Sequence, residues 1–173
     1  VLFRSQGHYE KAEQALLEVL PVFRKKKRLG SKQTIDCILK LSRVYKAQGR
    51  YEKVQQLWET TLEMMRRELG DEHPRTLMAT FHFGRIVRDW DLFNEAERLF
   101  REALEGQRRE LGDEHDNTLT SMHVLAELLT KQQNYHEAET LFAEVLKVTQ
   151  YKFGEDHPKT LTTKNAFGIL RRE

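Results

Sequence analysis

The sequence has few of the residues that define disulfide-rich, secreted or membrane-spanning proteins. It contains one cysteine, Cys37, so an internal disulfide is excluded, and this fits a reducing compartment. No apolar run approaches the roughly 18 residues that a membrane-spanning helix needs. The opening residues also lack the charged and apolar regions of a signal peptide. We therefore expect a soluble, cytoplasmic protein.

The sequence also has few prolines and a small net charge. The formal net charge is +2, which is too small to indicate a nucleic-acid partner by itself. Only 3 of the 173 residues are proline. Because proline interrupts helices, its scarcity favours long, unbroken ones.

The short motifs of common enzymes are missing as well. The sequence has no GxSxG elbow, no GxxxxGK[ST] phosphate loop, no GxGxxG turn, and no HExxH or paired-cysteine metal motif. Cys37 with a histidine is the remaining candidate for a nucleophilic pair, and we expect it to be a small buried thiol instead. The sequence thus predicts no catalytic residues, no cofactor and no enzyme activity.

What the sequence does contain is an internal repeat with a step of 42 residues. The octapeptide GDEHPRTL starts at Gly70, and it returns as GDEHDNTL at Gly112 and as GEDHPKTL at Gly154. Aromatic residues keep the same step at Tyr9, Tyr51, Phe93 and Tyr135. A fixed period of 20–50 residues is typical of a solenoid of stacked repeats.

Each repeat is predicted to form two helices, here named helix A and helix B. Pro74 suits the first turn of a helix A, and Gly112 suits the end of a helix B. Apolar residues recur at the three- and four-residue spacing of a helix, as in Ala96, Leu99 and Phe100. We expect helix A at about 34–48, 75–90, 117–132 and 159–172, and helix B at about 9–28, 51–69, 93–111 and 135–153. Residues 1–6 would end an earlier helix A. The expected fold class is all-α.

Three histidines recur beside acidic residues in the repeated loop. His73, His115 and His157 could be mistaken for metal ligands, but they lie one repeat apart on separate loops. Zinc needs ligands that converge on one ion at roughly 2.0–2.3 Å. We therefore expect these histidines to structure the loops, and we expect no metal site.

The repeat also has a family resemblance. A small residue in helix A recurs at Ser42, Gly84, Ala126 and Gly168, and an aromatic residue starts each helix B, followed by an alanine or valine and then a bulky residue. With the LGDEHPxTL and YxEAExLF stretches, this pattern resembles the tetratricopeptide repeat of the 42-residue kinesin-light-chain type. The resemblance covers essentially the whole chain.

The resemblance implies a right-handed α-solenoid of stacked antiparallel helix pairs, with helix A lining the concave face. The chain would then be a single array in which residues 1–28 are a partial first repeat and residues 29–70 the second. Residues 71–112 would be the third repeat, residues 113–154 the fourth, and residues 155–173 helix A of a truncated fifth.

Carried onto this sequence, the family's inward-facing positions define a candidate groove for a partner. It consists of Leu39, Lys40, Arg43, Lys46, Met78, Phe81, His82, Arg85, Arg88, His123, Glu127 and Asn165. Arginine can hold a carboxylate by two parallel hydrogen bonds. The groove therefore favours an acidic peptide with apolar anchors, although an ordinary solvated face remains the alternative.

Our main hypothesis is a non-enzymatic scaffold that binds a protein or peptide and belongs to a larger signalling or adaptor protein. The alternatives are a kinesin-light-chain-like cargo adaptor and a nucleic-acid-binding solenoid that uses basic helix ends, such as the run Arg24–Arg28. No membrane partner is expected. We also expect Phe167 and Leu170 on the last helix to be exposed, which would favour self-association of the terminal helices.

Overall fold

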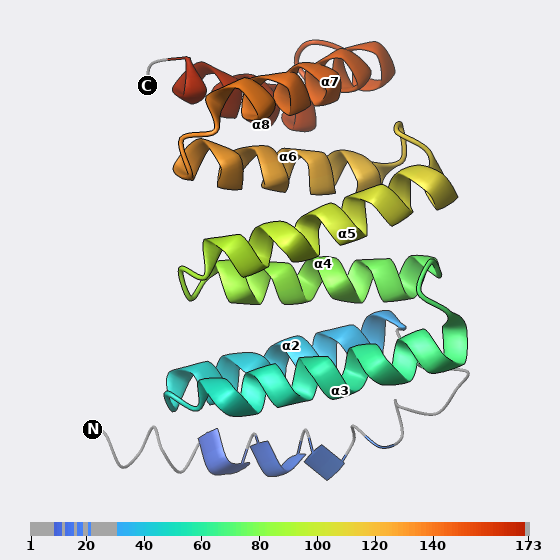
Figure 1. The fold of residues 1–173 in the computed structure, drawn as a ribbon, viewed down its shortest axis with the longest axis vertical. Coiled ribbons are helices and arrows are strands. Elements are labelled where there is room, and N and C mark those ends of the chain that lie inside the picture. Colours follow the sequence, from blue (N-terminus) through green and yellow to red (C-terminus); the bar gives the residue numbers. More distant parts are fainter. Residues whose placement is uncertain (1–8, 12, 16, 19–20, 22–30, 172–173) are drawn as a thin grey trace. The chain divides into compact units, whose positions relative to one another are not determined.

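The computed structural model describes residues 9–11, 13–15, 17–18, 21 and 31–171 (Figure 1). These described residues form helices and turns, without a β-strand. They belong to two compact units, residues 1–79 and 80–173, whose boundary lies inside one helix. Most of the expected helix at 9–28, the expected helix end at 1–6 and the basic run Arg24–Arg28 lie outside the described residues. None of the described helices is both long and apolar enough to cross a membrane.

In the first unit, α2 (Lys32–Ala47) packs against α3 (Tyr51–Leu69). The Ser31 hydroxyl caps α2 by accepting a hydrogen bond from the backbone N–H of Thr34 at 3.3 Å. At the small position of α2, the indole N–H of Trp58 donates to the Ser42 hydroxyl at 2.9 Å. The Ser42 hydroxyl in turn donates to the carbonyl of Ile38 at 2.8 Å. A small polar residue at this position thus satisfies the buried indole of the facing helix.

The boundary between the units lies within α4 (Pro74–Arg88). The second unit continues with α5 (Phe93–Leu111), α6 (Asp116–Lys131), α7 (Tyr135–Phe153) and α8 (Pro158–Leu170). In it α5 packs on α6, α6 on α7 and α7 on α8, and α6 also contacts α8 (Figure 1). The large side chains of Phe100, Leu125 and Phe142 are almost completely buried. Apolar faces are therefore covered by the next helix in the stack.

The helix ends agree with the sequence prediction to within a few residues. Gly112 ends α5 with a φ of 84°, a left-handed conformation that glycine adopts without the steric cost of a Cβ atom. Its backbone N–H donates to the carbonyl of Arg108 at 3.1 Å. Helix positions from residue 31 onwards are thus confirmed, and the all-α fold class with them.

The prediction for the last helix was wrong in one respect. Leu170 is only 6% exposed, because α8 packs on α7 and this contact covers the Leu170 side chain. Phe167 is half-buried, with its ring 6.1 Å from that of Phe142 and the Arg171 guanidinium 4.5 Å above it. The exposed large apolar residues of α8 are instead Leu161 and Ile169, at 49% and 50%.

Candidate partner-binding groove

In the first unit, the predicted groove residues lie on α2 and at the start of α4. Lys40, Arg43 and Lys46 are exposed, on the side of α2 away from its buried residues, and Leu39 is half-buried. Met78 of α4 is also half-buried. α2 therefore presents a basic, solvent-accessible surface within this unit.

In the second unit, Phe81 does not lie on an accessible surface. Its side chain is 4% exposed, and its ring lies 5.5 Å from that of Phe100. The packing of α4 on α5 takes this side chain into the core, so we remove it from the candidate groove. His82 is half-buried, with its ring centre 5.8 Å from that of Phe81, and Arg85 and Asn165 are exposed.

The structure does bring three of the predicted residues together. The Arg88 guanidinium lies 3.9 Å from one carboxylate oxygen of Glu127, and His123 Nε2 lies 3.5 Å from the other. The hydrogen bond with His123 lowers the pKa of Glu127 below its usual value. The positive charges of Arg88 and Lys131 act in the same direction, and partial burial opposes them. Glu127 is therefore held as a carboxylate by groups from both α4 and α6.

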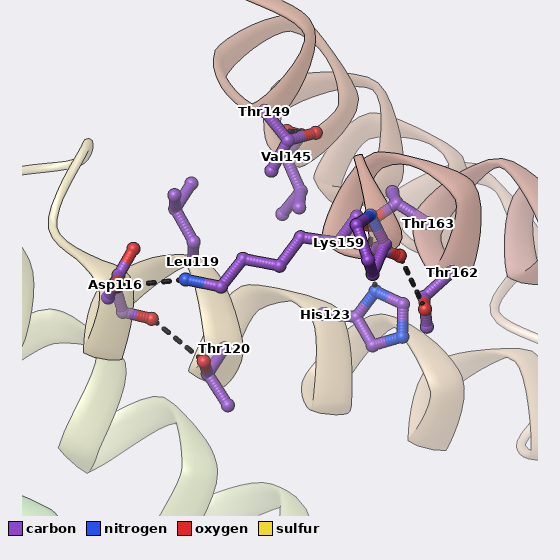
Figure 2. A pocket seen from close by; sticks show the side chains of 10 residues that line it. Asp116, Leu119, Thr120, His123, Val145, Thr149, Lys159, Thr162 and Thr163 are labelled. Atoms are coloured by element: carbon purple, nitrogen blue, oxygen red, sulfur yellow. Dashed lines mark hydrogen bonds and ion pairs between the residues drawn. The ribbon is translucent and has the colours of Figure 1, made fainter. Parts of the chain in front are cut away.

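Beside these residues, α6 and α8 form the two walls of a groove whose floor is α7. The first halves of the two walls enclose a pocket of about 270 Å³, here called the N-terminal pocket (Figure 2). Its lining consists of Asp116, Leu119, Thr120, His123, Val145, Thr149, Pro158, Lys159, Thr162 and Thr163. Val145 and Thr149 come from α7, and the other residues come from α6 and α8.

A second pocket of about 470 Å³, the C-terminal pocket, follows along the same two walls. It is lined by Arg88, Asp89, Asp91, Glu127, Leu128, Thr130, Lys131, Phe142, Ala166 and Ile169. Its charged residues come from α4, α6 and the turn after α4, whereas α7 and α8 contribute apolar residues. The two pockets together form the α6–α8 groove.

The threonines of the N-terminal pocket use their hydroxyl protons within their own helices. Thr120 donates to the carbonyl of Asp116 at 2.7 Å, and Thr162 to that of Pro158 at 2.8 Å. Thr163 and Thr149 bond back in the same way. These residues therefore offer methyl groups and hydroxyl lone pairs to the pocket, and no free hydroxyl proton.

The mouth of this pocket carries an ion pair that the sequence analysis missed. Lys159 Nζ on α8 lies 2.8 Å from Asp116 Oδ2 at the start of α6 (Figure 2). This contact, above all its hydrogen bond, lowers the pKa of Asp116 below its usual value. One signal could have revealed it, because Asp116 stands where the other two loops have Pro74 and Pro158.

The repeated histidines structure the loops, as predicted. In each loop the histidine Nδ1 accepts a hydrogen bond from the backbone N–H two residues later, at 3.1 Å for His73, 3.1 Å for His115 and 3.2 Å for His157. Each side chain thus satisfies a backbone donor in the first turn of a helix A. In the part of the chain that the structure describes, no group of three or more His, Cys, Asp or Glu residues is placed to hold a metal ion.

The single cysteine is also where the sequence predicted it. Cys37 lies on α2 and is 4% exposed, so its thiol is a small buried group. Reagents in solvent reach it only when the fold opens.

Comparisons with solved structures agree with this arrangement of helices. The chain superposes on BtubC (BKLC) from P. vanneervenii with a TM-score of 0.80 and 18% identity, and the match covers 99% of this chain and 66% of that one. It also matches the nearly identical TPR-like repeats of a kinesin light chain from Podosopora anserina, with a TM-score of 0.73, 22% identity and 98% and 81% coverage. A second crystal structure of those repeats gives a TM-score of 0.74 at 22% identity, with 98% and 80% coverage. At these identities the likeness establishes the fold.

Sequence comparison gives the family directly. No curated protein matches the chain. The family model described as "Tetratricopeptide repeat" matches residues 34–108, 91–150 and 123–173, which overlap and extend to the last residue. Together with the 42-residue period and the kinesin-light-chain-like neighbours, this match shows that the chain belongs to the tetratricopeptide-repeat family.

Proposed function

We propose that the chain is a non-enzymatic scaffold that binds a protein or peptide segment along the exposed sides of its A helices. The observation that carries this proposal is the α6–α8 groove, in which two pockets follow one another along the same two helices. Tetratricopeptide repeats and kinesin-light-chain-like neighbours support an interaction role in general. The groove supports the proposal that this interaction takes place between α6 and α8.

The groove dimensions suit an extended segment. α6 has 16 residues, so at 1.5 Å per residue the wall is about 24 Å long. An extended chain rises roughly 3.3 Å per residue, so about seven residues would span it. Such a segment can place one side chain in each pocket while its backbone remains between the two walls.

The partner is proposed to be acidic and to carry apolar anchors. Within the first unit, α2 exposes Lys40 and Arg43, and both can attract carboxylates. Within the second, the two pockets are lined by apolar side chains such as Leu119, Val145 and Ile169. The chain spans 66% of the length of BtubC, and we propose that it acts as part of a larger signalling or adaptor protein.

The proposal can be tested by selecting peptides from a randomised display library on the immobilised 173-residue chain. Binding of the selected peptides should shift the NMR methyl signals of Leu119, Val145 and Ile169. Thr162→Trp should fill the N-terminal pocket and weaken these peptides at least tenfold. Thr140→Trp is the matched control, because Thr140 is an exposed threonine of α7 that bonds back to His136 in the same way.

Two results would contradict the proposal. The first is that selected peptides shift only signals outside the groove and tolerate Thr162→Trp. The second is that single-stranded RNA or duplex DNA competes for the chain far better than any peptide, which would favour the nucleic-acid-binding alternative. A kinesin-light-chain-like cargo adaptor would use the same peptide chemistry, and the sequences of the selected peptides would then identify cargo candidates.

A further inference from the structure

The N-terminal pocket is bridged by the ion pair between Lys159 and Asp116. Figure 2 shows the Lys159 side chain extending from α8 to Asp116 at the start of α6. The two charged atoms are 2.8 Å apart, and the side chains are 46% and 60% exposed. Lys159 Nζ also lies 4.9 Å from the centre of the Phe153 ring. Both partners of this pair are therefore accessible from the pocket mouth.

Behind the ion pair, the pocket is suited to an apolar group. Leu119, Val145 and Pro158 line it with hydrocarbon, and the threonines add methyl groups while their hydroxyl protons stay bonded to their own helices. An apolar side chain would gain free energy by leaving water there. Among the described residues that line the pocket, Lys159 at the mouth is the one lysine or arginine that could pair with a negatively charged group.

We propose that the N-terminal pocket binds an apolar side chain of a protein segment that carries a carboxylate beside it, and that this carboxylate replaces Asp116 as the partner of Lys159. This inference rests on the proposed function and states what the partner must carry at this pocket. Asp116 then acts as an internal competitor, occupying Lys159 until a partner carboxylate arrives.

The competitor can be displaced because the pair is on the surface. Exposed ion pairs contribute little to stability, since both groups are well hydrated when apart. Replacing one carboxylate by another leaves the charge at Lys159 balanced, and the apolar anchor in the pocket adds the net gain. In the loops that begin at Gly70 and Gly154, the residue equivalent to Asp116 is a proline. The competing carboxylate is therefore specific to the repeat that forms this pocket.

A neighbouring ion pair offers a matched control. Lys152 Nζ lies 3.3 Å from a carboxylate oxygen of Glu114, in the same loop as Asp116. Its side chains are 34% and 62% exposed, close to the values of the first pair. Neither Lys152 nor Glu114 lines the N-terminal pocket. Glu114→Gln therefore removes a negative charge close to Asp116, as Asp116→Asn does, at a residue that does not line the pocket.

The test uses three acetylated octapeptides in a Gly-Ser background, which carry Leu-Glu, Leu-Gln or Ser-Glu at the centre. Binding to the full chain is measured from methyl NMR shifts of Leu119 and Val145. The Leu-Glu peptide should bind about two- to fivefold more tightly than Leu-Gln, the range expected for an exposed ion pair. Asp116→Asn should tighten Leu-Glu by a similar factor and leave Leu-Gln unchanged. Lys159→Gln should abolish the difference between the two peptides.

Glu114→Gln should leave all affinities unchanged, and thermal unfolding of each variant checks that the chain is folded. The inference is overturned if Asp116→Asn weakens Leu-Glu or leaves it unchanged, or if Ser-Glu binds as well as Leu-Glu. If library-selected peptides still bind in the α6–α8 groove in that case, the proposed function stands without this inference. If no peptide of either kind binds in the groove, both are contradicted.

Discussion

The phenyl ring of Phe100 lies against Gly84, so closely that a Cβ atom on residue 84 would be 2.8 Å from two of its ring carbons. Phe100 is completely buried and cannot turn its ring into solvent. The small residue in α4 thus sets how closely α4 and α5 approach in the second unit. This contact gives the recurrent small position of helix A a physical reason.

Gly84→Ala should therefore destabilise the chain, although alanine is the better helix former. Overpacking of a tight contact costs about 1–3 kcal/mol in the free energy of unfolding. Urea unfolding followed by circular dichroism would measure it. Gly168→Ala is the control at the same repeat position of α8, where no atom lies within 4 Å of the added Cβ. That variant should be stabilised by up to about 1 kcal/mol, and equal effects at the two positions would refute this account.

The histidine caps predict a second effect on stability. His115→Ala removes the side-chain acceptor for the Asn117 backbone N–H and should lower the free energy of unfolding by about 1 kcal/mol. His115→Asp should retain most of the stability, because a carboxylate also accepts this bond and suits a helix N-terminus. His136→Ala, on the exposed side of α7, should change stability by less than about 0.5 kcal/mol. If His115→Ala left the free energy of unfolding unchanged, the cap would contribute nothing to stability.

A pH-dependent effect is expected from an ion pair between α5 and α7. Arg101 makes two hydrogen bonds, at 2.6 and 2.8 Å, to the Glu137 carboxylate, and this lowers the pKa of Glu137 below its usual value. A carboxyl whose pKa is lower in the folded state stabilises the fold above its unfolded-state pKa of about 4.3, and this contribution disappears as the pH falls through the folded-state pKa.

Glu137→Gln should therefore destabilise the chain at pH 7, by an amount that shrinks as the pH falls below about 4. Urea unfolding of both proteins at several pH values would measure the difference. The pair is partly exposed, with side-chain exposures of 37% and 36%, so the effect should be modest. Glu105→Gln on the exposed side of α5 should show no such trend. A penalty for Glu137→Gln that grows towards acid pH would contradict the expected sign.

The basic side of α2 leads to a prediction about partners. The double variant Lys40→Glu with Arg43→Glu should weaken those acidic peptides selected on the chain that bind at α2, because attraction becomes repulsion. The affinity of the unchanged chain should fall between about 50 and 500 mM salt, since screening shortens the reach of exposed charges. Fluorescence titration would measure both effects. Lys147→Glu on the exposed side of α7 should have little effect, and equal losses at both places would mean a non-specific charge effect.

Most of the fold was predictable because the repeat marks its own helix ends. The glycine of each GDEHP-type loop follows the last residue of a helix B, and an aromatic residue is the first residue of α3, α5 and α7. The exposure of Leu170 was not predictable in the same way. Whether a side chain at the end of a stack is covered depends on the helix before it, and the pattern of apolar residues does not reveal how far that helix reaches.

The candidate site was predictable by position but not by contact. Phe81 and His123 hold the same place in successive repeats, yet the first is 4% exposed and the second lies in the groove. Both rings pack on the equivalent phenylalanine, Phe81 on Phe100 and His123 on Phe142. Polarity makes the difference, since a ring nitrogen of His123 also contacts Glu127. The pairing of Lys159 with Asp116 joins residues 43 positions apart. The aspartate in place of the proline of two other loops marks Asp116 in the sequence, but it does not identify the partner.

The loop between α5 and α6 has one more consequence. Asp113 pairs with Arg108 of α5 at 3.0 Å, while Glu114 and Asp116 pair with lysines of α7 and α8. One short connection thereby supplies ion-pair partners to α5, α7 and α8. Since each of these pairs is exposed and weak by itself, a protease cut in the loop should loosen the adjoining turns only slightly, and their amide hydrogens should exchange with solvent independently.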